Sequence, residues 1–122
     1  MSEGVLMRVL PDGGHEFVLE DPVLASIVVS GQIALVFGRT VVTVSGHVTL
    51  VVDGATHWLD TAHTSSLAPL LSCYPGTARW LWSTPAGQLT LVFMQGQRIV
   101  VPGARARTAW SVGATPWGVP AP

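Results

Sequence analysis

The sequence predicts a mainly β fold, in which two related antiparallel β-meander units form a sandwich or a partly closed barrel with one short connecting helix. Three observations lead to this prediction. Apolar residues alternate with polar ones or form short runs, Gly and Pro separate the runs, and the runs are rich in Val, Ile, Leu and Thr. Such runs between turn residues are typical of strands, and these side chains suit a pleated, half-buried surface.

The length and composition predict one domain with a large supply of apolar side chains. The chain has 122 residues, which suits a single core. Hydrophobic residues make up 48% of the chain and charged residues 11%, against about 25% charged in an average domain. Because large exposed apolar patches usually mark interfaces, this composition favours self-association or a partner protein. The alternative is that Ser, Thr, Gly and Gln cover the outer strand faces.

Residues 1–22 are expected to form an N-terminal hairpin, and residues 24–60 the first β unit. The turn Pro11–Gly14 joins strands Val5–Leu10 and His15–Leu19, since Gly supplies the positive φ that tight turns need. Asp53-Gly54 predicts a two-residue hairpin within the first unit. The strands expected in that unit are Leu24–Ser30, Ile33–Phe37, Thr40–Val44, His47–Val52 and Ala55–Leu59.

Residues 64–74 are expected to hold the one short helix, and residues 77–113 the second β unit. Thr64 or Ser65 can cap the helix, and its leucines fall on one face. Pro69 limits its length, because Pro lacks the N–H that a helix interior uses. A Pro-rich tail, 114–122, follows the second unit. The strands expected in that unit are Ala78–Ser83, Gln88–Phe93, Arg98–Val101 and Thr108–Val112.

The two β units resemble each other in sequence. Gly31–Phe37 matches Gly87–Phe93, and after a short turn Arg39–Val42 matches Arg98–Val101. We interpret this as one antiparallel meander used twice, with the helix as connector. Such units can pack face to face or close into a barrel. The alternative is convergence, because Gly-Gln followed by alternating apolar residues arises easily.

The charges are few and segregated. All seven acids lie in residues 1–60, and the chain has no Lys. Two halves of opposite sign can attract each other within the fold or steer partners. Nucleic acid is excluded as an expected partner, because binding it needs several basic side chains on one face. Arg105 and Arg107 form the one local basic spot, and two solvated loop arginines are the alternative interpretation.

The sequence predicts a cytoplasmic protein. Cys73 is the only cysteine, which excludes an intramolecular disulfide and fits a reducing compartment. The first residues have no basic region followed by an apolar run, so no secretory signal is expected. No apolar run is long enough for a membrane span, so no membrane association is expected.

His57, Asp60 and His63 are the weak candidates for metal ligands. Their spacing of three residues is usable, and Asp53 or His47 can complete the set if the hairpin folds over. No established ligand motif is present, however, and a polar strand end leading into a loop explains the residues better. We therefore expect no metal and no cofactor.

The sequence also offers little for catalysis. Cys73 and His63 can be written as a nucleophile and its base, but nothing in the sequence orients them or provides an oxyanion hole. A single Cys after a Leu-rich helix is more typical of a small buried apolar residue. Whether the chain is an enzyme stays open at this point, with the absences favouring a non-enzymatic role.

The tryptophans are the best candidates for a binding site. The chain has five: Trp58, Trp80, Trp82, Trp110 and Trp117. Trp80 and Trp82 are two residues apart, so on a strand they share one face. Trp is enriched at binding hot spots, although filling the core is the alternative for most of these residues. Trp117 lies in a stiff Pro-rich segment that either docks on its own domain or inserts into a neighbour.

Residues 70–112 resemble the C-terminal part of a family of small, uncharacterised actinobacterial domains. The resemblance rests on Gly-bounded strands that lead to a Pro and a Trp; these residues are Gly87, Leu89–Phe93, Gly96, Arg98–Val101, Pro102 and Trp110. The resemblance implies a β-rich fold and an immunity-like or accessory role, and it implies no catalytic residues. The family usually has an acid shortly before the Trp, where this chain has Arg107-Thr108-Ala109.

The leading hypothesis is a non-enzymatic interaction domain that binds another protein or itself through Trp-bearing strand surface. The first alternative is a small-molecule-binding barrel or sandwich, with Trp58, Trp80 and Trp82 lining a pocket. The second is a small metal-dependent or thiol hydrolase that uses the His57, Asp60, His63 and Cys73 set.

Overall fold

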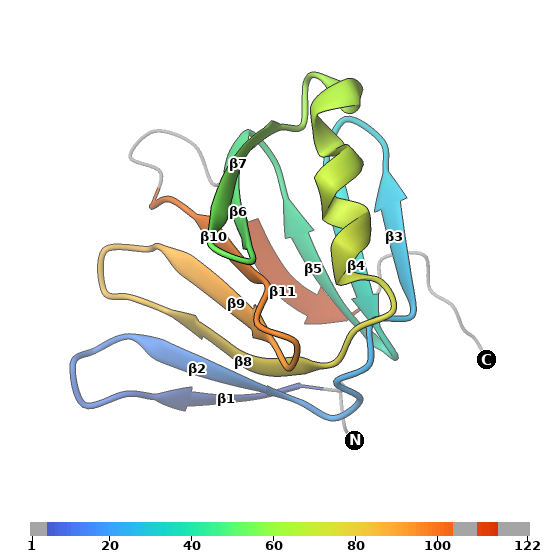
Figure 1. Ribbon diagram of the computed structural model, residues 1–122. Helices are drawn as coiled ribbons and strands as arrows, with labels where there is room; N and C mark the ends of the chain where they lie inside the picture. Colours follow the sequence, from blue (N-terminus) through green and yellow to red (C-terminus); the bar gives the residue numbers. More distant parts are fainter. Residues whose placement is uncertain (1–4, 104–109, 115–122) are drawn as a thin grey trace.

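The structure is a computed structural model that describes residues 5–103 and 110–114 (Figure 1). Within these residues the chain forms strands and one 3₁₀ helix, so the prediction of a mainly β fold is confirmed. Each strand lies close to its predicted bounds. The elements are β1 (Val5–Val9), β2 (His15–Leu19), β3 (Ser26–Val29), β4 (Ile33–Phe37), β5 (Thr40–Val44), β6 (His47–Val52), β7 (Ala55–Asp60), η1 (Thr64–Cys73), β8 (Ala78–Ser83), β9 (Leu89–Phe93), β10 (Arg98–Val101) and β11 (Trp110–Ala114).

The strands form two antiparallel sheets that pack as a sandwich and do not close into a barrel within the described residues. The larger sheet has seven strands in the order β1-β2-β8-β9-β10-β6-β7, and the smaller has four in the order β11-β5-β4-β3. In Figure 1 the larger sheet curves from β1 at the bottom to β7 near the top, and the smaller sheet lies behind it. The N-terminal hairpin therefore extends the larger sheet beside β8.

The internal repeat appears in the topology, in an exchanged form. The meander β3–β4–β5 lies in the smaller sheet, and the equivalent meander β8–β9–β10 lies in the larger one. The next strand of each unit crosses to the opposite sheet: β6 pairs with β10, and β11 pairs with β5. Each unit thus completes the sheet of the other, which two independently folded meanders would not do.

One detail of the sequence match is wrong. We matched Arg39 with Arg98, but the strand registers make Val41 the equivalent of Arg98. Both Val41 and Arg98 stand opposite the next-to-last residue of the preceding strand. In the first unit, the turn before Val41 consists of the two residues Gly38 and Arg39. In the second unit, the turn before Arg98 consists of the three residues Met94–Gly96. The match of Arg39 with Arg98 required the second turn to be three residues longer than the first, whereas it is one residue longer, and Arg39 is a turn residue without a strand counterpart.

The core lies between the sheets and shows the repeat most clearly. The central strands β4 and β9 have the same burial pattern along their length. Their equivalent final residues, Phe37 and Phe93, contact each other across the sandwich, with ring centroids 6.5 Å apart and planes tilted by 31°. Both rings are at most 1% exposed. The same sequence pattern therefore builds both halves of one shared core.

The helix η1 closes the core beside β6 and β7. Its buried side chains are Leu67, Leu70 and Cys73, which join the main hydrophobic cluster. It is a 3₁₀ helix that contains Pro69. The backbone bonds at its two ends span three residues, as in Ser66 N–H to the His63 carbonyl. No helix in the described part of the chain is long and apolar enough to cross a membrane.

Two turns fix strands that matter for the surface described below. Asp53 and Gly54 both have positive φ, 51° and 81°, which is the two-residue turn expected between β6 and β7. Gly14 sits where β2 meets β8, and a Cβ on it would lie 2.2 Å from the carbonyl oxygen of Ser83. Only Gly permits this approach, which holds the N-terminal hairpin against the rest of the larger sheet.

Candidate binding face

One face of the larger sheet carries a register row that crosses all seven strands. The paired residues are, from β1 to β7, Arg8, Glu16, Trp82, Thr90, Val100, Thr49 and Trp58. Directly paired residues in antiparallel strands point to the same side of a sheet. Their neighbours along the strands, such as Leu81 and Leu91, are buried in the core. The row therefore lies on the outer face, which we call the binding face.

The middle of the binding face is a shallow strip between two tryptophans. Trp82 and Trp58 are four strands apart, which corresponds to about 19 Å at the usual strand spacing. The three residues between them, Thr49, Thr90 and Val100, are short and β-branched. Thr90 is 3% exposed, so the open part of this floor lies at Val100 and Thr49, on the side of Trp58.

The tryptophans of this face are available to solvent to different degrees. Trp58 is 79% exposed and Trp80 52% exposed, whereas Trp82 is partly buried. The rings of Trp80 and Trp82 lie 5.0 Å apart with a 53° angle between their planes, as their spacing on one strand predicts. An exposed Trp contributes little to packing within the domain, so Trp58 and Trp80 are the residues most suited to contact a binding partner.

Polar groups hold the Trp80–Trp82 end of the face in place. The indole Nε1–H of Trp80 donates to Glu16 Oε2 at 3.2 Å. The other carboxylate oxygen of Glu16 forms an ion pair with Arg8. The sequence suggested that the acids of the first half meet arginines of the second, but this acid pairs with an arginine of the same hairpin. The paired charges orient the ring of Trp80 without adding net charge.

Arg98 adds a positive charge to this face, to which the carboxylate of Asp60, two residues after Trp58 on β7, also belongs. It is exposed on β10 and stands opposite Val92 on one side and Val51 on the other. Sequence reasoning did not single out Arg98 or the β-branched floor, because only the strand order brings them between the tryptophans. The period-two pattern of each strand did contain the signal for which residues face outward.

Trp110 has a different position from the other described tryptophans. It begins β11 in the smaller sheet, and its ring packs edge-to-face on Phe17 with centroids 6.1 Å apart. Its Nε1–H donates to the Gly87 carbonyl at 2.7 Å. Half-buried and hydrogen-bonded, Trp110 links the smaller sheet to β2. Trp117, Arg105, Arg107 and the tail from residue 115 lie outside the described residues.

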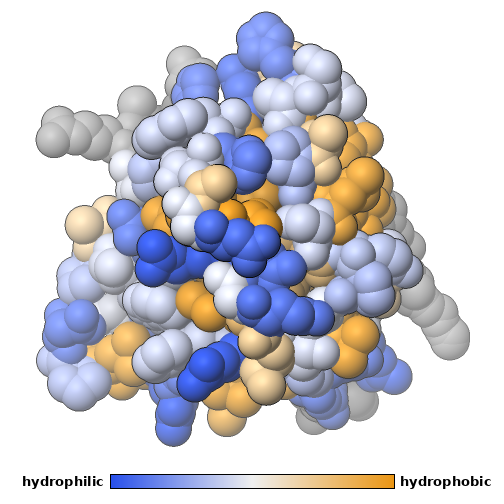
Figure 2. Space-filling model, in the orientation of Figure 1, coloured by the Kyte–Doolittle hydropathy of each residue, from blue (hydrophilic) through white to orange (hydrophobic). Residues whose placement is uncertain are grey.

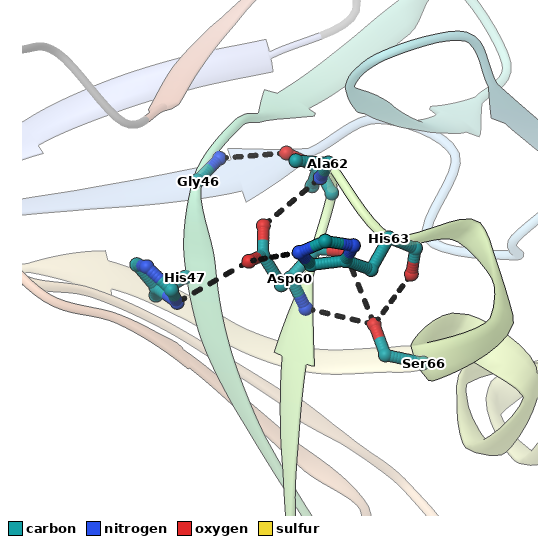
Figure 3. A network of polar contacts seen from close by, with 7 residues as sticks. Gly46, His47, Asp60, Ala62, His63 and Ser66 are labelled. Atoms are coloured by element: carbon teal, nitrogen blue, oxygen red, sulfur yellow. Dashed lines mark hydrogen bonds and ion pairs between the residues drawn. The ribbon is translucent and has the colours of Figure 1, made fainter.

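The histidines and Asp60 form a strand-end network (Figure 3). His63 Nε2 and His47 Nδ1 lie 3.7 Å and 3.9 Å from Asp60 Oδ2. The other carboxylate oxygen accepts the Ala62 N–H at 2.9 Å. Ser66 Oγ accepts the Asp60 N–H at 2.9 Å and bonds the carbonyl of His63. These contacts join the end of β7 to the start of η1.

The structure thus brings His63, but not His57, together with Asp60. His57 lies three residues earlier on β7 and points to the other face of that strand, and His47 from β6 takes the second imidazole position. In the described part of the chain, no group of three or more His, Cys, Asp or Glu side chains is arranged to hold a metal ion. The geometry favours the structural interpretation, a polar link at a strand end.

Cys73 is a core residue. Its side chain is 1% exposed at the end of η1, among the residues of the main cluster. Burial raises the pKa of its thiol from 9.0 to about 11, against a smaller opposing effect of a hydrogen bond with Ser72. At neutral pH the thiol is therefore protonated, which is the inert form for nucleophilic attack.

A narrow cleft opens where β2 and β8 separate. The two strands pair only at His15 with Ser83 and at Glu16 with Trp82. Beyond these pairs lies a space of about 220 Å³, lined by residues of both strands and by Trp80. Ligand pockets for drug-sized molecules usually measure about 300–1,000 Å³. The cleft is therefore a small feature at the margin of the binding face.

The hydrophobic surface elsewhere is distributed unevenly. Figure 2 shows hydrophilic residues mixed with isolated hydrophobic ones over most of this side of the molecule, with more hydrophobic surface over β3 and at the lower margin near β1. The exposed residues concerned are Val28 and Val29 on β3, and Leu6, Met7 and Val9 on β1. The edge strands are thus less well covered than the sheet centres.

Comparisons with known proteins place the chain in a family without giving it an activity. No curated protein and no solved structure matches it. A family model matches residues 15–118, which include both β units, the helix and the whole stretch on which the resemblance rested. The chain therefore belongs to a family of unknown function, DUF6188.

Proposed function

We propose that this protein is a non-enzymatic interaction domain that binds a partner protein through the binding face of its larger sheet. The observation that carries the proposal is the exposure of Trp58 and Trp80 on one side of a sheet whose other side is the core. An accessory or immunity-like role in the cytoplasm of an actinobacterium is one concrete form of this function. The buried, unpaired Cys73 fits a reducing compartment.

The energetics of interfaces support this use of the face. Removing a Trp that anchors an interface typically costs about 2 kcal/mol or more, which is about a 30-fold loss of affinity. The ring of Trp80 is held by its hydrogen bond to Glu16, so little conformational freedom is lost when a partner covers it. The rigid sheet beneath positions Trp58 and Trp82 at fixed separation.

The charge of the face specifies the chemistry of the partner. Arg98 is exposed between apolar neighbours, and the charges of Arg8 and Glu16 compensate each other. A complementary surface therefore has an apolar strip that covers the β-branched floor, and a carboxylate opposite Arg98. Complementary charges of this kind act mainly on association rate and on the choice of partner.

The test is a quantitative affinity capture from a lysate of the source organism. The parent chain is compared with the double variant Trp58→Ala/Trp80→Ala, and with Leu71→Ala as matched control. Leu71 is 66% exposed on η1, outside the larger sheet, so its substitution controls for the loss of an exposed apolar side chain elsewhere on the molecule. Captured proteins are then purified, and their affinities for the three chains and for Arg98→Glu are measured directly.

We expect one partner that the parent chain and Leu71→Ala retain and the double variant loses. Its affinity falls about 30-fold or more for each essential Trp, and Arg98→Glu slows its association. Circular dichroism of each variant establishes that the fold is kept. Equal retention by all the chains, or no partner for any of them, would refute the proposal.

The small-molecule alternative has weaker support. This alternative needs a pocket lined by Trp, and the cleft between β2 and β8 has Trp80 at its margin. The volume of about 220 Å³ is below the range of about 300–1,000 Å³ that is usual for drug-sized ligands. The exposed Trp58 stands at the opposite edge of the sheet and contributes nothing to that cleft.

A further inference from the structure

Among the residues that the structure describes, the strand β1 forms an unprotected edge of the larger sheet. Its apolar residues are exposed on both faces: Leu6 is 63% exposed, Met7 57% and Val9 71%. Native edge strands are commonly protected by charges, Pro or a bulge. Arg8 is the one charged residue of β1, and Glu16 on the neighbouring strand already pairs with it.

The backbone groups that point away from β2 belong to Val5, Met7 and Val9. The N–H of Leu10 donates to the Gly14 carbonyl at 2.7 Å, so Leu10 occupies a hydrogen-bonded position of the hairpin. Along an antiparallel strand such positions alternate. The backbone groups of Leu6 and Arg8 therefore also face β2. The N–H and C=O groups of the alternate residues, Val5, Met7 and Val9, point to the open edge.

We propose that β1 pairs with β1 of a second copy of this chain, antiparallel, about a twofold axis at Met7. In this register Met7 stands opposite its own copy, and Val5 opposite Val9 of the second copy. Each opposed pair exchanges two backbone hydrogen bonds, because all three residues have outward-facing groups. The two larger sheets then form one continuous sheet.

The side chains are complementary in the same register. Val5, Met7 and Val9 point to one face, so every opposed pair on that face is apolar. On the other face Leu6 lies opposite Arg8 of the second copy, whose aliphatic stem can cover it. The charge of Arg8 is already compensated within its own copy, so the edges meet without like-charge repulsion.

These properties point to a second copy rather than to an unrelated strand. A twofold interface requires a surface that is complementary to itself, and β1 meets this requirement in both its backbone and its side chains. Pairing also places the two Trp80–Trp82 clusters on one continuous face, on either side of the junction. A partner that binds the face then meets two equivalent sites.

The first experiment measures the mass of the full chain by light scattering and sedimentation over a wide range of concentration. Met7→Pro removes the N–H at the axis but no bond within the hairpin, because that N–H points outward. Met7→Lys places two like charges opposite each other, and Met7→Leu keeps an apolar side chain. We expect a dimer for the parent and for Met7→Leu, and monomers for the other two.

The second experiment tests the register by oxidative cross-linking. Met7→Cys places two thiols at the axis, where paired Cα atoms are about 5.5 Å apart, within the range of disulfides. Val9→Cys is the matched control, because Val9 is at least as exposed as Met7 on the same face but stands far from its own copy. The parent chain is the negative control, because its one cysteine, Cys73, is buried. We expect a cross-linked dimer from Met7→Cys alone.

Each outcome decides the proposal. A parent chain that stays monomeric at its solubility limit overturns it, as does a dimer that persists in both Met7→Pro and Met7→Lys. Cross-linking of Val9→Cys as efficient as that of Met7→Cys overturns the register. Circular dichroism and thermal melting establish that the variants are folded, which is expected because Met7 is 57% exposed.

Discussion

The contact between Phe37 and Phe93 predicts that the two halves of the repeat are energetically coupled. These residues end the equivalent strands β4 and β9, are at most 1% exposed, and pack on each other at a centroid distance of 6.5 Å. The perturbation is a double-mutant cycle with Phe37→Leu and Phe93→Leu. Leu keeps part of the buried volume, whereas Ala at both positions would remove too much stability to measure.

The magnitude follows from the burial and the ring contact. Replacing a buried Phe by Ala costs about 3–5 kcal/mol, and a chain of this length has a total stability of roughly 6–18 kcal/mol. We therefore expect each Leu substitution to cost about 2 kcal/mol. An aromatic pair contributes about 0.5–1.5 kcal/mol beyond its area. The double variant should thus cost less than the sum of the singles by about that amount.

Urea unfolding followed by circular dichroism measures all four free energies of unfolding. A loss of about 2 kcal/mol lowers the midpoint by roughly 1 M urea. Phe37→Leu combined with Leu6→Ala is the control cycle, because Leu6 is exposed on the outer face of the other sheet. Additivity within about 0.3 kcal/mol for the Phe cycle would refute direct packing between the repeats.

Three further predictions concern single residues. The thiol of Cys73 has a pKa of about 11 in the folded chain and 9.0 when unperturbed, so the unfolded state loses its proton first. The free energy of unfolding should therefore fall by about 2 kcal/mol as the pH rises from 9 to 11. Urea titrations of Cys73→Ala should show no such fall. Ser66→Ala removes the hydroxyl that accepts the Asp60 N–H and should cost about 1 kcal/mol, with faster amide exchange at the start of η1. Gly14→Ala places a Cβ 2.2 Å from the Ser83 carbonyl and should cost more than about 2 kcal/mol, whereas an unchanged midpoint would contradict the observed packing of β2 on β8.

The strands could be predicted from the sequence because the signals for them are local. The turn Asp53-Gly54 has the positive φ angles that its residues predict, and the alternating runs on either side are strands β6 and β7. β11 runs two residues past its predicted end. β3 is shorter than predicted, because apolar residues continue beyond its ladder. Leu24, for example, was included in a strand but is a buried residue before β3.

The pairing of the strands could not be predicted, because it depends on contacts far apart in the sequence. The repeat suggested two meanders, but nothing in Gly46 or Pro102-Gly103 says that β6 and β11 cross to opposite sheets. The Arg39–Arg98 match failed for a related reason: it assumed a second turn three residues longer than the first, and the strand pairing shows that it is one residue longer.

The sequence allowed the tryptophans of the candidate site to be predicted, but not the β-branched residues between them. Trp80 and Trp82 share a face because they are two residues apart on a strand. Trp58 joins that face through pairings along β9, β10 and β6 that no sequence spacing records. Trp110 is also a Trp, but it fills the gap between β11 and β2. Residue type alone therefore did not distinguish a Trp that can anchor a partner from one that packs within the domain.

The comparison of the two repeats supplies the strongest argument that the binding face serves a purpose other than folding. The strand registers make Ser26 the equivalent of Trp80, and Val28 the equivalent of Trp82. The core residues of the two units are alike, whereas these outer positions differ. Since the first unit folds with Ser and Val, the fold does not require the tryptophans. Trp80→Ser and Trp82→Val should therefore change the free energy of unfolding by no more than about 1 kcal/mol each, yet remove partner binding.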